Sequence, residues 1–188
     1  FAYRSENSEN SAVRVFEVDA SPTQEWKRRS LRDAGIAVPD TVAFVSADLA
    51  DGSTPARLVD AGFDPGRPAF VSWLGVSMYL GLDAVDRILA MVGGWASGSE
   101  LVMDHLLPEG RRDAAGQAYA EAVQAAAARG GEVWRTFLSP EESARLLAAH
   151  GFTVLEQAGA RGSVDRDLWS RSDHLRPFDL PVLVHART

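Results

Sequence analysis

The residues best suited to chemistry in this chain are two carboxylates, Glu17 and Asp19, which end an apolar, β-branched run. In nucleotide-binding α/β domains an acid at the end of a buried parallel strand binds a ribose, because a carboxylate can accept two hydrogen bonds from a vicinal diol. Residues two apart share one face of a strand, so both acids can point toward the same ligand. A solvated acid is the alternative for Asp19, and a salt bridge, for example to Arg4, is an equally good role for Glu17.

A Gly-rich turn normally lies about 20 residues before such a ribose-binding acid. Counting back from Asp19 reaches Phe1 without meeting one. The sequence therefore predicts a nucleotide-binding domain whose first strand and Gly-rich loop are absent from this chain.

Other candidate residues for chemistry follow later strands. His105, at the expected carboxyl end of a strand, could take a proton from a hydroxyl substrate, although a half-exposed loop histidine is the simpler interpretation. Trp73 and Tyr79 flank another strand end, where aromatic side chains form either core or pocket wall. Arg161 could pair with a substrate carboxylate in a bidentate manner or with a neighbouring acid such as Asp165.

Strand and helix patterns alternate along the chain. The expected strands are Val13–Val18, Thr41–Val45, Ala69–Leu74, Glu100–Asp104, Phe152–Glu156 and Pro181–His185. The expected helices are Ser21 to about Ala34, Thr54–Ala61, Asp83–Val92, residues 113–129, and Ser139 to His150. The sequences that begin at Ser21 and Ser139 both match the capping box, in which a Ser and a Glu or Gln three residues later cap the helix start.

This alternation predicts a doubly wound α/β fold, with a largely parallel sheet covered on both faces. No helix pattern separates the last two strands, so we expect them to form an antiparallel hairpin at one edge of the sheet. Such a hairpin favours a methyltransferase over a dehydrogenase.

Composition excludes several classes of function. The 188 residues suit a single domain, and the formal charge of -7 argues against nucleic acid or an anionic membrane as a partner. The chain has no cysteine, which excludes disulfides and thiolate sites and fits a cytoplasmic location. No apolar run is long enough to span a bilayer, and no spacing of histidines and acids suggests a metal site.

Several short segments occur in a characteristic order and spacing: Phe1–Arg4, Val15–Asp19, Ala47–Leu49, Leu74–Leu80, Leu138–Glu142 and His150–Phe152. Together they resemble the leucine carboxyl methyltransferase-like family, and more closely its bacterial S-adenosylmethionine-dependent O-methyltransferases. The resemblance covers nearly the whole chain. It implies a Rossmann-like class I methyltransferase sheet of seven strands, with S-adenosyl-L-methionine as cofactor and a carboxylate or hydroxyl of a small molecule as methyl acceptor.

The resemblance also implies roles for individual residues. Asp19, with Glu17 beside it, would hold the ribose, and Asp48 and Leu49 would bracket the adenine. Trp73 and Leu74 belong to the same expected cofactor-binding set, although the family often has a Glu at the position of Leu74 that holds the amino acid end of the cofactor.

For the acceptor, Tyr79 and Arg161 are the expected binding residues, and His105 is the base if the acceptor is a hydroxyl. A carboxylate acceptor is already an anion and needs no base.

In the family's sheet the strand before the Gly-rich turn is central, between the strands that end at Asp19 and Leu74. Without it, two strand edges would lack hydrogen-bond partners, so we expect residues 1–188 not to form a stable monomer and the first and third strands not to pair directly. Two other interpretations remain open: a Rossmann-type NAD-dependent oxidoreductase, and a non-catalytic methyltransferase-like fragment.

Overall fold

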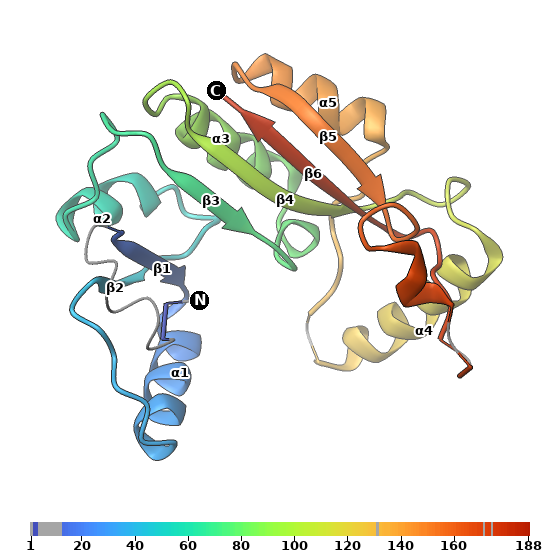
Figure 1. Cartoon of the computed structure of the whole chain (residues 1–188), viewed down its shortest axis with the longest axis horizontal. Helices are drawn as coiled ribbons and strands as arrows, with labels where there is room; N and C mark the ends of the chain where they lie inside the picture. The colour runs from blue at the N-terminus through green and yellow to red at the C-terminus, as the bar shows by residue number, and fades with distance from the viewer. Residues whose placement is uncertain (1, 4–12, 131, 171, 174) are drawn as a thin grey trace. The chain divides into compact units, whose positions relative to one another are not determined.

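The computed structural model describes residues 2–3, 13–130, 132–170, 172–173 and 175–188, and Figure 1 traces the chain. The chain forms two compact units, Phe1–Asp64 and Pro65–Thr188, which are described one at a time. The prediction of a single domain over residues 1–188 stays a prediction.

The first unit is a parallel pair of strands with helices after each strand. β1 (Val15–Asp19) pairs in parallel with β2 (Val42–Ser46), and α1 (Ser21–Asp33) connects them. α2 (Thr54–Asp60) follows β2. This strand–helix–strand order is the predicted one, because a parallel pair needs a crossover connection.

The start of α1 differs from the prediction. Ala20, not Ser21, is the N-cap residue, and no side chain caps the helix. The Ser21 hydroxyl instead hydrogen-bonds the Ser46 hydroxyl at the end of β2. The Gln24 side chain is buried and donates from Nε2 to the Glu17 carbonyl oxygen over 2.9 Å. The expected capping box is therefore wrong here, because both polar side chains bond to the strands instead.

The second unit is built on one mixed sheet of four strands. The strands lie in the order β3 (Phe70–Trp73), β4 (Glu100–Leu106), β6 (Pro181–Arg187) and β5 (Thr153–Gly159). β3 and β4 are parallel, whereas β6 is antiparallel to both of its neighbours. The predicted antiparallel hairpin of the last two strands is confirmed, and it inserts β6 between β4 and β5.

Among the described strands, β1 pairs only with β2, and β3 pairs only with β4. In the described part of the chain, β1 and β3 do not pair directly. This agrees with the expectation that they would not; direct pairing would have contradicted it. The prediction that residues 1–188 are unstable as a monomer remains to be tested.

Helices of the second unit lie along and beyond its sheet. Figure 1 shows α3 (Leu82–Gly93) and α5 (Pro140–Ala149) along the same face of the sheet. α4 (Ala114–Gly130) follows the carboxyl end of β4, and the short helices η2 (Ser77–Tyr79) and η3 (Arg166–Trp169) lie in loops. No described helix is long and apolar enough to cross a membrane.

The core of this unit has two parts, one on a face of the sheet and one against α4. The apolar side of α3 is buried and includes Val85, Ile88, Leu89 and Val92. In the sheet, the buried cross-strand neighbours are Leu101, Met103, Val184 and Ala186. A further cluster joins Met78, Leu106, Ala120 and Leu180, with Trp134, Phe137 and Phe178 packed against it.

Candidate functional site

Two acids of the first unit lie at the same edge of its sheet. Asp19 is the last residue of β1, and Asp48 follows β2 by two residues. Asp19 is paired in register with Ser46, and the Ala47 amide donates to the Asp19 carbonyl oxygen over 3.0 Å. Both acidic side chains are exposed. The parallel pairing thus brings the two predicted cofactor ligands to one strand end.

Backbone amides hold one oxygen of each of these carboxylates. Asp19 Oδ1 accepts from the Ala20 amide, and Asp48 Oδ1 accepts from the Ala50 amide, each over 2.8 Å. Among the described residues, neither Oδ2 atom has a hydrogen-bond partner, and the Leu49 amide has none either. Fixed carboxylates with a free oxygen can accept from hydroxyl or amino groups, and a free amide can donate to a ring nitrogen.

Glu17 has a structural partner. Its Oε2 lies 2.7 Å from Lys27 Nζ on α1, and only a fifth of its side chain is exposed. Lys27 Nζ also lies 5.4 Å from the centre of the Tyr3 ring, and burial with nearby Glu17 raises the pKa of Tyr3. The predicted salt bridge of Glu17 therefore exists, but with Lys27. The alternative partner Arg4 lies outside the described residues.

In the second unit, Asp104 connects the carboxyl ends of β3 and β4. Its Oδ1 accepts from the Gly75 amide over 2.8 Å, and its carbonyl oxygen accepts from the Ser77 hydroxyl over 2.5 Å. Gly75 has a φ of 71°, a conformation that glycine adopts most easily. Burial raises the pKa of Asp104 from its ordinary value, against the lowering effect of the Gly75 amide.

His105 lies inside β4, which continues to Leu106, and not in the loop after it. Its side chain is 1% exposed, and neither ring nitrogen has a hydrogen-bond partner among the described residues. Burial lowers the pKa of His105 to about 4. The prediction of a half-exposed histidine at a strand end is therefore wrong, because β4 is two residues longer than expected and turns this position toward the core.

Trp73 and Leu74 differ in accessibility. Trp73 is paired in register with Met103, so its indole lies on the buried face of the sheet, and its Nε1 has no partner among the described residues. Leu74 follows β3 and is 49% exposed. β3 also carries Phe70, which is largely exposed in this unit.

Tyr79 lines a cavity of about 310 Å³ together with Glu132, Val133 and Arg135. Arg135 has an exposed side chain, and its guanidinium has no hydrogen bond or ion pair within the described part of the chain. A cavity of this size is at the lower end of the range for small-molecule sites.

Backbone bonds fix the wall of this cavity against η2. The amides of Arg135 and Thr136 both donate to the Met78 carbonyl oxygen, over 2.7 and 3.2 Å. The Thr136 hydroxyl donates to the Leu80 carbonyl oxygen over 2.6 Å, and the Leu138 amide donates to the Leu106 carbonyl oxygen over 2.9 Å. These hydrogen bonds fix the irregular segment 132–138 to η2 and to the end of β4.

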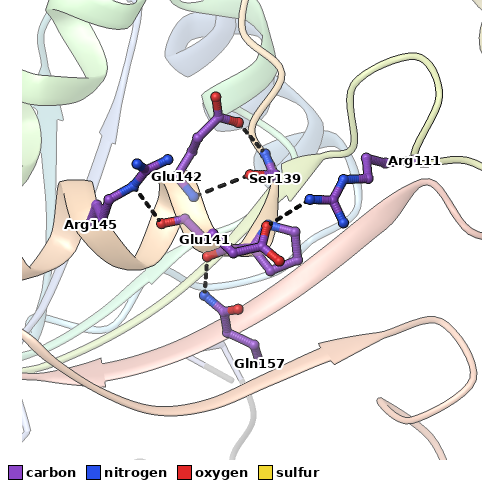
Figure 2. A network of polar contacts seen from close by, with 7 residues as sticks. Arg111, Ser139, Glu141, Glu142, Arg145 and Gln157 are labelled. Atoms are coloured by element: carbon purple, nitrogen blue, oxygen red, sulfur yellow. Dashed lines mark hydrogen bonds and ion pairs between the residues drawn. The ribbon is translucent and has the colours of Figure 1, made fainter.

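The start of α5 anchors the far end of that segment (Figure 2). The Ser139 hydroxyl accepts from the Glu142 amide over 3.2 Å, and Glu142 Oε2 accepts from the Ser139 amide over 2.8 Å. This is the predicted capping box. Glu141 Oε2 lies 3.3 Å from Arg111 Nη2, and Gln157 Nε2 on β5 donates to the carbonyl oxygen of the first helical residue, Pro140, over 3.2 Å.

Arg161 pairs with acids rather than lining the cavity. Its Nη2 lies 2.9 Å from Asp113 Oδ2, and its Nε lies 3.6 Å from Asp179 Oδ1. Asp113 Oδ1 also accepts from the amides of Gly116 and Asp179, over 2.7 and 3.2 Å. Arg161 thus joins the loop after β5 to the start of α4 through Asp113, and it also lies close to Asp179 of its own loop rather than to the predicted Asp165.

Two other histidines have structural partners. His150 Nε2 lies 2.7 Å from Asp86 Oδ1, and His185 Nε2 lies 2.9 Å from Glu100 Oε2. The sequence indicated no partner for His185, because strand register alone brings it close to Glu100. His174 and Arg171 lie outside the described residues. Within the described part of the chain, no group of three or more His, Asp or Glu side chains is arranged to hold a metal ion.

Sequence reasoning missed two residues of interest. Asp104 stands beside His105 and was passed over, although its place near the end of a parallel strand was a usable signal. Arg135 lies in an irregular segment without any sequence pattern, so only the folded chain brings it next to Tyr79.

Proteins similar to this chain are named as methyltransferases. The family model described as leucine carboxyl methyltransferase matches residues 1–93. The chain is 29% identical over 188 residues to a Bacillus subtilis protein named "Putative S-adenosyl-L-methionine-dependent methyltransferase YktD", covering 99% of this chain and 61% of that protein. A Mycolicibacterium smegmatis protein with a similar name is 40% identical over 95 residues, covering 49% of this chain and 31% of its own length. The chain thus spans less than two thirds of these relatives.

Solved structures agree on the fold. A "duf574 family protein" from Streptomyces avermitilis superposes with a TM-score of 0.67 at 20% identity, covering 97% of this chain and 68% of that one. An S-adenosylmethionine-dependent methyltransferase from Mesorhizobium loti gives a TM-score of 0.60 at 18% identity, covering 94% and 81%. The predicted family resemblance and the class I methyltransferase fold are confirmed.

Proposed function

We propose that the protein transfers a methyl group from S-adenosyl-L-methionine to an oxygen of a small organic molecule, and the match of residues 1–93 to the leucine carboxyl methyltransferase family model supports this. The oxygen is that of a carboxylate or a hydroxyl. The names of the relatives support the cofactor, and the residues of this chain support its binding.

The observation that carries this proposal is the joint position of Asp19, Asp48 and Leu49 at one end of the β1–β2 pair. Among the described residues, one carboxylate oxygen of Asp19 has no partner and can accept from ribose hydroxyls. One oxygen of Asp48 and the amide of Leu49 likewise have no described partner, and together they match the amino group and an adjacent nitrogen of adenine. These groups fit an adenosine moiety.

When bound, the cofactor supplies an electrophilic methyl group for in-line displacement by the acceptor oxygen. The protein's part is to align the acceptor and exclude water, which can lower a barrier by several kcal/mol, about 7–11 kcal/mol in the most favourable intramolecular cases. In the second unit, the cavity beside Tyr79 is the place for the acceptor. Arg135, rather than the predicted Arg161, has a guanidinium available to orient an anionic group there.

The burial of His105 bears on the acceptor. A general base must reach the proton that it takes, within about 2.6–3.2 Å or through one water. His105 is held on the buried face of β4 with a lowered pKa, so it can serve a hydroxyl acceptor only if the core opens. A carboxylate acceptor, which needs no base, is compatible with this burial.

Calorimetry tests the proposal. This protein should bind S-adenosylhomocysteine, and Asp19→Asn should weaken that binding by about 1–3 kcal/mol, the range for lost charge-assisted hydrogen bonds. Asp33→Asn, at the exposed end of α1, is the matched control and should leave the affinity unchanged. Equal affinity in the Asp19 variant and the parent protein would contradict the ribose assignment.

NAD distinguishes the main alternative in the same experiment. Binding of NAD without S-adenosylhomocysteine would favour a Rossmann-type oxidoreductase. Binding of neither would favour a non-catalytic role for this chain.

A further inference from the structure

The residues that line the cavity of the second unit combine two opposite charges with apolar surface. Glu132 and Arg135 carry the charges, and Tyr79 and Val133 supply an aromatic ring and an aliphatic side chain. Tyr79 is 39% exposed and Val133 is 45% exposed, so both leave apolar surface that a ligand can cover. All of these residues belong to the unit Pro65–Thr188.

The two charged side chains of the cavity do not neutralise each other. Although Glu132 and Arg135 are close in sequence, no ion pair or hydrogen bond joins their side chains. Neither side chain has such a partner elsewhere in the described part of the chain, and both are exposed. The cavity therefore offers a ligand one carboxylate and one guanidinium.

Other arginines near this segment are already engaged. Arg112 lies 5.0 Å from the centre of the Phe137 ring and donates from Nε to the Leu107 carbonyl oxygen over 2.8 Å, and Arg111 pairs with Glu141. Arg135 differs from both, because only its backbone is bonded: its amide donates over 2.7 Å to the carbonyl oxygen of the residue before Tyr79. Its guanidinium thus projects from a fixed backbone beside the aromatic ring.

Resting on the proposed function, we propose that the methyl acceptor held in this cavity is a zwitterion, a small molecule with a positively charged amine and an anionic group on an apolar body. The anionic group pairs with Arg135, and the ammonium pairs with Glu132. The apolar body covers Tyr79 and Val133. The cavity volume of about 310 Å³ restricts the acceptor to a small molecule.

Opposite charges in one cavity also exclude simpler ligands. An anion without an amine pairs with Arg135 but lies close to the carboxylate of Glu132, and two like charges at short distance repel each other. An amine without an anion meets the same repulsion from Arg135. A zwitterion pairs with both side chains, so attraction and repulsion together favour it over either singly charged analogue.

The test uses three probes built on one phenyl ring. Phenylalanine carries both charges, hydrocinnamate lacks only the ammonium, and phenethylamine lacks only the carboxylate. Glu132→Gln removes the negative charge of the cavity, and Arg135→Met removes the positive one. Glu156→Gln is the matched control, because Glu156 is an exposed acid on β5, at the opposite edge of the sheet from β3.

Ligand-observed NMR on the parent protein should show phenylalanine binding roughly fivefold tighter than either singly charged probe, the scale of one accessible ion pair. In Glu132→Gln the preference over hydrocinnamate should vanish, while the preference over phenethylamine remains. Arg135→Met should show the reverse pattern, and Glu156→Gln should behave as the parent protein.

Two results would overturn the proposal: no preference for phenylalanine in the parent protein, or a full preference over hydrocinnamate in Glu132→Gln. No cofactor takes part in these measurements, so they fail separately from the proposed function. Absent selectivity with intact binding of S-adenosylhomocysteine contradicts only the zwitterion. Selectivity without binding of S-adenosylhomocysteine contradicts the proposed methyl transfer, while the cavity keeps its preference for a zwitterion.

Discussion

His105 and Val182 are cross-strand partners in the antiparallel β4–β6 ladder, and both side chains lie on its buried face. The partner is apolar, and the backbone of Leu138 and Leu106 near the His105 ring offsets only part of the effect of burial on its pKa. Its pKa of about 4 in the folded protein, below the ordinary value of 6.5, therefore has a direct physical cause in burial.

This burial predicts a pH-dependent stability. Between pH 6.5 and about 4 the unfolded chain binds a proton at His105 that the folded protein excludes, so the stabilisation is complete above pH 6.5 and is lost as the pH falls toward 4. From pH 8 to pH 5, His105 should lower the free energy of unfolding by about 2 kcal/mol. Urea titrations should show this loss in the parent protein and not in His105→Leu. Equal losses in both proteins would contradict the prediction.

The capping box of α5 should contribute measurably to stability. Ser139→Ala removes the acceptor for the Glu142 amide and should lower the free energy of unfolding by about 1 kcal/mol. Ser163→Ala, at an exposed loop position, should have little effect. Chemical denaturation of both variants checks this, and indistinguishable midpoints would show that the cap is unimportant.

Gly93 marks a close approach between α3 and the end of α5. A Cβ at this position would lie 2.1 Å from the His150 carbonyl oxygen, so the helices must separate to admit one. Gly93→Ala should therefore destabilise the protein, by about 1–3 kcal/mol. Gly81→Ala is the control, because no atom lies within 4 Å of its added Cβ and its φ of -68° suits any residue. Thermal unfolding of the two variants should differ clearly; matching melting temperatures would argue against a tight contact.

Replacing Arg135 and replacing Arg161 should have different effects on anion binding. Phenylacetate, used as a probe, should enter the cavity beside Tyr79 and bind roughly tenfold or more weakly to Arg135→Met, since a charge-assisted bond is lost. Arg161→Met should leave probe binding unchanged, because that guanidinium is already paired with Asp113. Ligand-observed NMR measures both variants. A loss confined to Arg161→Met would restore the original assignment of the acceptor site.

Local patterns along the chain were enough to predict the order of helices and strands and the acids that end the first strands. Local signals sufficed there: β-branched runs predicted β1 and β2, and the capping box at Ser139 fixed the start of α5. The position of Asp19 at a strand end followed from the same pattern.

Which side chains are buried, and which of them form pairs, could be read only from the folded chain. His105 is a core residue because β4 continues to Leu106 and pairs with β6 up to that residue. Neighbouring residues of a strand point to opposite faces of the sheet, so the register of this pairing decides that His105 faces the core. Glu17 forms an ion pair with Lys27, and Arg161 forms one with Asp113, which lies 48 residues away in the sequence. Such partners depend on strand register and loop path, which no local pattern in the sequence encodes.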